Sequence, residues 1–125
     1  MHSTVLVVED EPSVLMFLED GLEDRGFAVV SARSGGEALS ILGSGFPEIS
    51  VLVADIRIGD GIDGWEIARC AREITPGLPI VYVTGDSAGA WEDQGVTASV
   101  LLQKPFTRFE LADAIGSVLD RSYAA

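Results

Sequence analysis

The chain has few of the residues that build disulfides, zinc sites and histidine-based catalysis. Among its 125 residues it has one cysteine, Cys70, and one histidine, His2. A single cysteine excludes an intrachain disulfide and a cysteine-based zinc site. A lone histidine beside the start of the sequence argues against a histidine-centred catalytic triad and against a multi-histidine metal site.

Positive charge is scarce as well, and no hydrophobic run is long. Eight lysine and arginine residues stand against 20 aspartate and glutamate residues, which gives a formal net charge of −12. Such an acidic surface argues against direct binding to nucleic acid or to an anionic membrane. No apolar run approaches the roughly 18–20 residues of a membrane span, and no signal-like stretch precedes the first strand pattern. We therefore expect a cytoplasmic protein.

Short apolar runs alternate along the chain with segments of helical spacing, and hydrophobic residues make up 47% of the sequence. This alternation predicts one α/β domain over residues 1–125, built on a doubly wound, five-stranded parallel sheet with five helices. The flavodoxin-like strand order 2-1-3-4-5 is the natural choice for such a sheet. The expected strands are Thr4–Val8, Phe27–Ser31, Ser50–Ala54, Leu78–Val83 and Thr97–Leu102.

Capping signals predict where the helices begin. Ser34, Asp63 and Thr107 each stand three residues before a glutamate, which is the pattern of a capping box. Pro12 suits the first turn of the helix after the first strand, because its missing N–H would have no partner there. The helix with the weakest signal is expected over Ser87–Gln94.

Polar residues follow the expected strands at their carboxyl ends, where a sheet of this order places its chemistry. They are Glu9, Asp10 and Glu11 after the first strand, Asp55 after the third, Thr84, Gly85 and Asp86 after the fourth, and Lys104 and Pro105 after the fifth. We expect Glu9, Asp10 and Asp55 to meet in one cleft. Thr84 and Lys104 should lie opposite these three carboxylates.

Clustered carboxylates repel one another unless a cation lies between them. Mg²⁺ suits such a site because it prefers oxygen ligands, keeps several bound waters and neutralises charge on a transferred phosphoryl group. A carboxylate can form an acyl phosphate, so Asp55 is predicted to be the nucleophile. Lys104, the only lysine, and the hydroxyl of Thr84 would bind the phosphoryl oxygens.

Over nearly its whole length the sequence resembles the response-regulator receiver domains of two-component signalling, with a fold like that of the chemotaxis regulators. Five motifs underlie the resemblance, in order along the chain: Val8-Glu9-Asp10-Glu11, Val53-Ala54-Asp55, Asp63-Gly64, Val83-Thr84-Gly85 and Lys104-Pro105-Phe106. Any one of them alone is weak evidence. All five in this order and at suitable spacing are strong evidence.

The resemblance implies a role for each of these residues. Asp55 would be the phosphoacceptor and Asp10 a direct Mg²⁺ ligand, while Glu9 would act directly or through water. The backbone carbonyl of Arg57 would be a further ligand, and the Lys104–Pro105 peptide bond would be cis. The donor would be a phosphohistidine on a histidine kinase or phosphotransfer protein. Output would reach a downstream protein through the face of the fourth helix, fifth strand and fifth helix.

Three positions bear on phosphoryl lifetime and on the switch. Arg57 and Asp86 occupy positions that in this family control the access of water to the acyl phosphate, and we expect them to pair across the mouth of the site. The family often has an aromatic switch residue three positions before the lysine, where this chain has Leu101. The coupling of Thr84 to an aromatic ring is therefore expected to be altered or absent.

Other functions stay open at this level. The domain could be a receiver module from a hybrid kinase or a multidomain regulator, or a degenerate receiver, although the intact residue set argues against degeneracy. A flavin or nucleotide module would need a phosphate-binding loop after the first strand, where Glu9-Asp10-Glu11 stands instead. A phosphohydrolase with an aspartyl-phosphate intermediate would have a second aspartate at position 57, where Arg57 stands.

Overall fold

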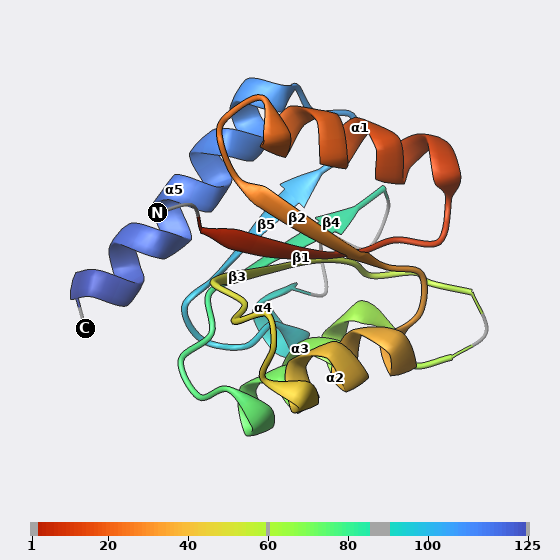
Figure 1. Ribbon diagram of the computed structural model, residues 1–125, viewed down its shortest axis with the longest axis vertical. Helices are drawn as coiled ribbons and strands as arrows, with labels where there is room; N and C mark the ends of the chain where they lie inside the picture. Colours follow the sequence, from red (N-terminus) through yellow and green to blue (C-terminus); the bar gives the residue numbers. More distant parts are fainter. Residues whose placement is uncertain (1–2, 60, 86–90, 125) are drawn as a thin grey trace.

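The computed structural model describes residues 3–59, 61–85 and 91–124. In this part of the chain five parallel strands form one sheet in the order β2-β1-β3-β4-β5, which confirms the predicted fold class and strand order (Figure 1). The strands are β1 (Thr4–Val8), β2 (Ala28–Ala32), β3 (Val51–Asp55), β4 (Ile80–Thr84) and β5 (Ser99–Gln103).

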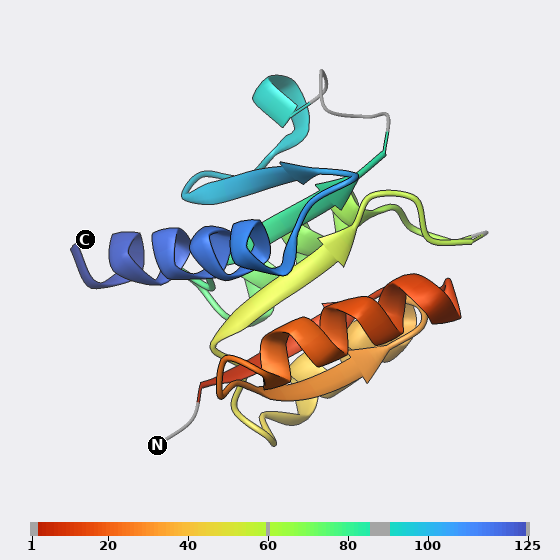
Figure 2. The same cartoon turned by 90° about the horizontal axis from the view of Figure 1, so that it is seen from above.

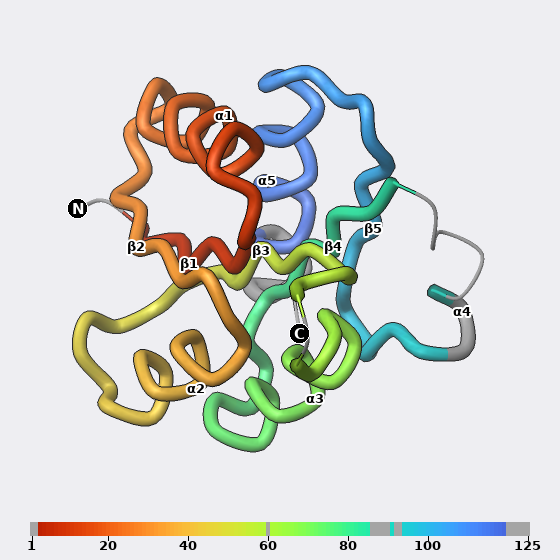
Figure 3. Tube along the Cα trace, turned by 90° about the vertical axis from the view of Figure 1, so that its right-hand side faces the viewer, coloured from red at the N-terminus to blue at the C-terminus, as the bar shows by residue number. Residues whose placement is uncertain are grey.

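Helices cover both faces of this sheet. The helices are α1 (Pro12–Glu23), α2 (Gly35–Ser44), α3 (Gly64–Ile74), α4 (Trp91–Gln94) and α5 (Arg108–Ala124). Viewed along the strands, α1 and α5 lie above the sheet, whereas α2 and α3 lie below it (Figure 3). α4 lies beyond the β5 edge, as the view from above also shows (Figure 2). None of the helices within the described residues is long and apolar enough to cross a membrane.

The two helical layers bury two separate hydrophobic clusters against the central strands. β3 and β4 are buried at every position, which explains why their sequences read as continuous apolar runs. Alternate residues of β1 contribute to opposite clusters: Leu6 packs on the α2–α3 side and Val7 on the α1–α5 side. The sheet is thereby held rigidly between the layers, so its carboxyl edge is a firm base for a site.

The predicted helix starts are largely as expected. The Ser34 hydroxyl accepts a hydrogen bond from the Glu37 backbone N–H at 3.1 Å, and Asp63 Oδ1 accepts one from Glu66 at 2.9 Å. Thr107 forms both bonds of a capping box with Glu110. These side chains satisfy N–H groups that have no partner within their own helix.

Four strand predictions are wrong at their ends. β2 to β5 each begin one or two residues later than predicted, because hydrogen-bond pairing rather than hydrophobicity sets the ends. Phe27 N–H, for example, donates to Leu22 O in the turn after α1. The described part of α4, Trp91–Gln94, ends at the predicted residue, whereas residues 87–90 of the predicted helix lie outside the described residues.

Candidate functional site

The carboxyl ends of four strands meet at one cleft. Glu9 and Asp10 directly follow β1, Asp55 and Thr84 end β3 and β4, and Lys104 directly follows β5. These five residues line a cleft of about 400 Å³ together with Glu11, Arg57 and Gly85. The side chains that the sequence predicts to converge therefore do share one space.

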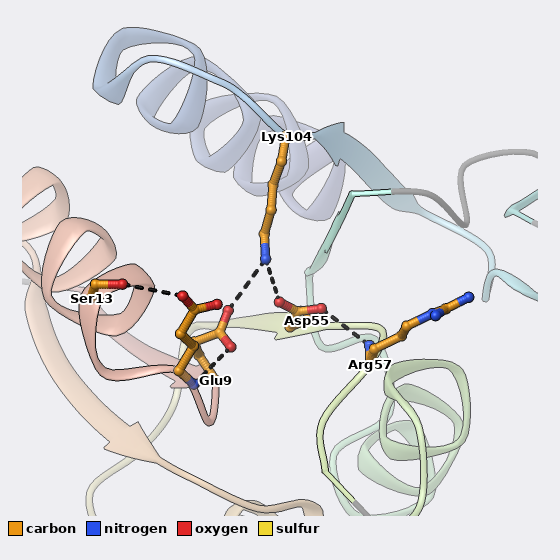
Figure 4. Close-up of polar contacts among 6 residues, drawn as sticks. Glu9, Ser13, Asp55, Arg57 and Lys104 are labelled. Atoms are coloured by element: carbon orange, nitrogen blue, oxygen red, sulfur yellow. Dashed lines mark hydrogen bonds and ion pairs between the residues drawn. The ribbon is translucent and has the colours of Figure 1, made fainter.

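The Lys104 ammonium lies between two carboxyl groups of this cleft. Its Nζ donates a hydrogen bond to Asp55 Oδ2 at 2.7 Å and lies 3.6 Å from Glu9 Oε1 (Figure 4). Burial lowers the pKa of the Lys104 ammonium, but the hydrogen bond to Asp55 and the charges of Asp55 and Glu9 outweigh it, so that its pKa is raised overall. Lys104 is therefore held charged between two carboxylates.

Asp55 is oriented through both of its oxygens. Asp55 is only 6% exposed. Its Oδ2 accepts a hydrogen bond from Lys104, and its Oδ1 accepts one from the backbone N–H of Arg57 at 3.1 Å. The strand ladder holds its backbone as well, because Asp55 pairs with Val83 of β4. A carboxylate fixed in this way presents its oxygens in one direction, which is what a nucleophile with a single target needs.

Glu9 is the most deeply buried of the cleft carboxylates, at 1% exposure. Its Oε2 accepts from the Glu11 backbone N–H at 3.1 Å, whereas its buried Oε1 accepts no hydrogen bond within the described residues. Burial, and then the neighbouring Asp55 carboxyl group, raise the pKa of Glu9 to about 8, against the opposing influence of the Glu11 N–H and Lys104. Glu9 Oε1 thus lies 3.6 Å from the Lys104 ammonium without a hydrogen bond, and it can accept a further positive partner.

This donor set fits a hard divalent cation. Among the described residues, no three His, Cys, Asp or Glu side chains lie close enough together to hold a metal ion by themselves. Mg²⁺ does not need such a cage, because it binds through one or two carboxylates and retains several waters. Glu9 Oε1 offers an unsatisfied oxygen, Asp10 is exposed at the rim, and Arg57 lines the same cleft. The residues present therefore fit Mg²⁺.

Thr84 links the two sides of the cleft. It is 1% exposed at the end of β4, and its backbone carbonyl accepts from Lys104 N–H at 2.7 Å. The next peptide bond, Lys104–Pro105, is cis as predicted. The turn after β5 is therefore attached to the end of β4 at the residue that bears the cleft hydroxyl.

Of the three positions that bear on phosphoryl lifetime and on the switch, the structure describes two, Arg57 and Leu101. Arg57 is exposed and lines the cleft, but Asp86 lies outside the described residues, so the predicted pairing of the two stays a prediction. Leu101 is half-buried in β5 and stands opposite Tyr82 of β4 in the parallel register. The buried Tyr82 ring packs on Trp65 with ring centroids 4.6 Å apart. An aromatic ring is thus present one strand away from the position where the family often has one.

Two features of the site were missed by reasoning from the sequence. An apolar hollow of about 320 Å³ adjoins the cleft, with Phe17 and Phe106 in an edge-to-face contact, and Lys104 borders both spaces. The other is the close packing of Gly64 against the backbone of Asp55. Phe17, an exposed aromatic residue on α1, was a possible signal for the hollow. No local sequence pattern indicates the contact between Gly64 and the Asp55 backbone.

Comparison with known proteins agrees with this geometry. The sequence profile of the response regulator receiver domain matches residues 5–116. The chain belongs to this family. A solved response regulator receiver protein from Sinorhizobium medicae superposes on this receiver with a TM-score of 0.92 at 41% identity, covering 97% of each chain. The response regulator receiver protein CpdR of Brucella abortus is 32% identical over 92% of this receiver and 95% of its own length.

This protein is accordingly a receiver domain of two-component systems, and the flavin-module and phosphohydrolase interpretations are set aside. Longer relatives contain the same unit. The transcriptional regulatory protein GlrR of Escherichia coli is 31% identical over 97% of this receiver, which spans only 27% of the length of GlrR. The family is therefore found both in proteins of about this size and within larger regulators.

Proposed function

We propose that Asp55 accepts a phosphoryl group from a phosphohistidine of a histidine kinase or phosphotransfer protein, in a Mg²⁺-dependent reaction. The observation behind this proposal is the geometry of one buried carboxylate. Asp55 is held between the Lys104 ammonium, at 2.7 Å, and the Arg57 backbone N–H, at 3.1 Å, in a cleft with three further acidic residues. This arrangement suits a nucleophile whose product bears more negative charge than the reactant.

In the proposed step an Asp55 carboxylate oxygen attacks phosphorus as the bond between phosphorus and the donor histidine nitrogen breaks. Lys104, already within hydrogen-bond distance, and the Thr84 hydroxyl would bind the phosphoryl oxygens. Glu9, Asp10, Asp55 and the Arg57 backbone carbonyl would hold Mg²⁺, which when bound neutralises charge on the phosphoryl group. The domain would thus catalyse only its own phosphorylation and dephosphorylation.

The phosphodonor would cover the surface beside the cleft, because its histidine has to reach Asp55. The adjoining hollow has an apolar lining from Val14, Phe17 and Phe106, and it shares Lys104 with the cleft. An apolar side chain of the donor seated there would place the donor directly over the acceptor. The acidic residues at the cleft favour a donor with a basic rim.

Output would pass through the face of α4, β5 and α5. The described part of α4 is a single turn, which contributes little stability of its own. The Trp91 indole N–H donates to the Ser99 hydroxyl of β5 at 3.1 Å, which attaches this turn to the sheet. We propose that phosphorylation shifts this attachment and so changes the binding of a downstream protein. With Leu101 in place of an aromatic residue, the shift would not depend on a ring at that position.

Arg57 and Asp86 are proposed to control the lifetime of the acyl phosphate. Arg57 stands at the mouth of the cleft and can limit the access of water to the acceptor. Arg57→Ala should then lose its phosphoryl group faster than the wild type. A dephosphorylation rate equal to or below that of the wild type rejects this role.

We further propose that residues 1–125 form one receiver domain that works in the cytoplasm, alone or as a module of a larger regulator. The family match over residues 5–116 and the single sheet support one receiver domain. The chemistry of the phosphodonor supports the cytoplasmic location, since kinases phosphorylate their histidines where ATP is available. Detection of the receiver in a periplasmic fraction would overturn the proposed location.

The decisive test is labelling of the purified protein by acetyl phosphate, or its trapping by beryllofluoride, with and without Mg²⁺. With acetyl phosphate, intact mass should increase by one phosphoryl group only when Mg²⁺ is present. Asp55→Ala should abolish the increase, whereas an exposed carboxylate far from the cleft, replaced in Asp113→Asn, should not affect it. Equal labelling of Asp55→Ala and wild type would refute the assignment of Asp55.

A further inference from the structure

Gly64 is the first residue of α3 and lies directly against the backbone of the acceptor. A Cβ atom built on Gly64 would stand 2.5 Å from Asp55 O and 2.8 Å from Ile56 Cα, closer than Cβ atoms approach other heavy atoms in proteins. The Gly64 N–H also donates to Ile56 O at 2.8 Å. The missing side chain therefore allows α3 to begin in contact with the end of β3.

The atoms that such a methyl group would meet cannot easily move aside. They belong to the backbone, and this backbone is bound to the next strand: Asp55 pairs with Val83, and Ile56 N–H donates to Val83 O at 3.1 Å. A displaced side chain could change rotamer, but a displaced strand end has to break or lengthen these bonds.

α3 cannot easily retreat in the other direction either. On the α2 side, Gly35 packs so closely that a Cβ there would lie 2.7 Å from Ile62 Cγ1 and 3.0 Å from Ile67 Cγ1. Ile67 is itself fully buried in the core below the sheet. The start of α3 is thus packed closely on two sides, against the end of β3 and against Gly35 of α2.

We infer that Gly64 is a positioning residue for Asp55, an inference that rests on the proposed function. Because the residue has no side chain, α3 seats against the Asp55–Ile56 backbone and fixes the height of the acceptor carboxylate in the cleft. That height sets the distance from Asp55 to Lys104, which directly follows β5, and to Glu9, which directly follows β1. A side chain at Gly64 would displace the acceptor relative to both partners.

The test is the rate of phosphorylation by acetyl phosphate at saturating Mg²⁺ in Gly64→Ala. A misplacement of the reacting group on the ångström scale costs up to about 100-fold in rate, so we expect a loss of roughly 10- to 100-fold. Gly61→Ala is the matched control, since a Cβ there meets nothing within 4 Å, and its rate should equal that of the wild type.

Loss of stability has to be separated from loss of positioning. Ile67→Val removes a buried methyl group from the same helix and should lower the stability of the fold without adding a side chain against Asp55. The phosphorylation rate of both variants is measured at urea concentrations below the onset of their unfolding. A reduced rate in Gly64→Ala together with an unchanged rate in Ile67→Val supports positioning, whereas a wild-type rate in folded Gly64→Ala overturns it.

A second variant covers the case in which Gly64→Ala does not fold. In the double variant Ile62→Ala with Gly64→Ala, the trimmed Ile62 gives α3 room on the α2 side. A rate at least threefold below that of Ile62→Ala alone supports the inference, and an equal rate overturns it. Failure of the proposed function is distinct, because wild type would then not be labelled at Asp55 at all.

Discussion

Lys104 Nζ and Asp55 Oδ2 lie 2.7 Å apart although 49 positions separate the two residues in the sequence. Asp55 is almost fully buried, whereas the Lys104 side chain is 30% exposed, so the ammonium closes the open side of a buried carboxylate. The same ammonium is 3.6 Å from Glu9. The Lys104 ammonium therefore interacts with two carboxyl groups, one at the end of β3 and one directly after β1, and the stability and chemistry of the cleft both depend on it.

Lys104→Met is expected to destabilise the protein near neutral pH. The variant leaves Asp55 and Glu9 buried beside each other without their cation, which should lower the free energy of unfolding by roughly 1–3 kcal/mol. Urea denaturation measures this change. Arg33→Met removes a positive charge from an exposed position and is the control. Equal stability of the two variants would show that the Lys104 contact contributes nothing.

The same variant should also slow phosphorylation. Loss of a positioned donor to a developing charge costs about 100- to 1,000-fold in rate. Acetyl phosphate labelling followed by intact mass measures this rate, with Arg33→Met expected to behave as wild type. A Lys104→Met rate within threefold of the wild type would remove Lys104 from the proposed chemistry.

Without Mg²⁺, the Glu9→Gln variant should be more stable than the wild type near pH 8, the folded-state pKa of Glu9. In the fold the pKa of Glu9 is raised from 4.5 to about 8. Between these values folded Glu9 keeps a proton that unfolded Glu9 has lost, so its contribution to wild-type stability declines as pH rises through this range. Glu9→Gln has no carboxyl group to titrate at this position, so the difference between its free energy of unfolding and that of the wild type should grow with pH.

Urea denaturation in the presence of a chelator, at the two ends of that range, tests the Glu9 prediction. Glu48→Gln replaces an exposed glutamate and is the control for the change in net charge. A stability difference between Glu9→Gln and wild type that is the same at both ends, or that shrinks toward high pH, contradicts the burial argument.

Mg²⁺ is expected to raise the stability of the folded protein. A ligand that binds only the folded state adds about 1.4 kcal/mol to the free energy of unfolding when its concentration is ten times its Kd. Asp10→Asn should lose most of this increment, because the rim carboxylate is a proposed direct ligand. Asp113→Asn, an exposed change on α5, should keep it. Thermal unfolding across a Mg²⁺ titration, with Ca²⁺-free buffer, measures the increment, and an equal increment in both variants excludes Asp10 as a ligand.

Tyr82→Phe should loosen the segment between α4 and β5. The Tyr82 hydroxyl accepts from Val96 N–H at 3.1 Å, while the ring itself packs on Trp65. The variant keeps the ring and loses the bond, which should cost about 0.5–1.5 kcal/mol. Hydrogen exchange at the Val96 amide should become faster, with the β3 amides unchanged. Unaltered exchange at Val96 would mean that the hydroxyl does not hold this segment.

Reasoning from the sequence was accurate where local chemistry decides. Ser34, Asp63 and Thr107 cap helices as predicted, because a cap depends on residues three positions apart. Strand ends were less accurate, since they depend on pairing with distant strands. Asp55 belongs to β3 because Val83 pairs with it, and no property of Asp55 itself reports that pairing.

The amino-acid sequence alone determined the layered α/β fold, the strand order and the set of polar residues at the carboxyl edge, because hydrophobic periodicity and parallel topology leave few alternatives. Only the tertiary structure decided that Glu9 is buried with an unsatisfied oxygen and that Lys104 reaches two carboxylates. It also decided that α3 can begin against Asp55 only through a residue without a side chain. Burial, ion-pair distance and close packing are relations between segments far apart in the chain, so they first exist when the sheet assembles.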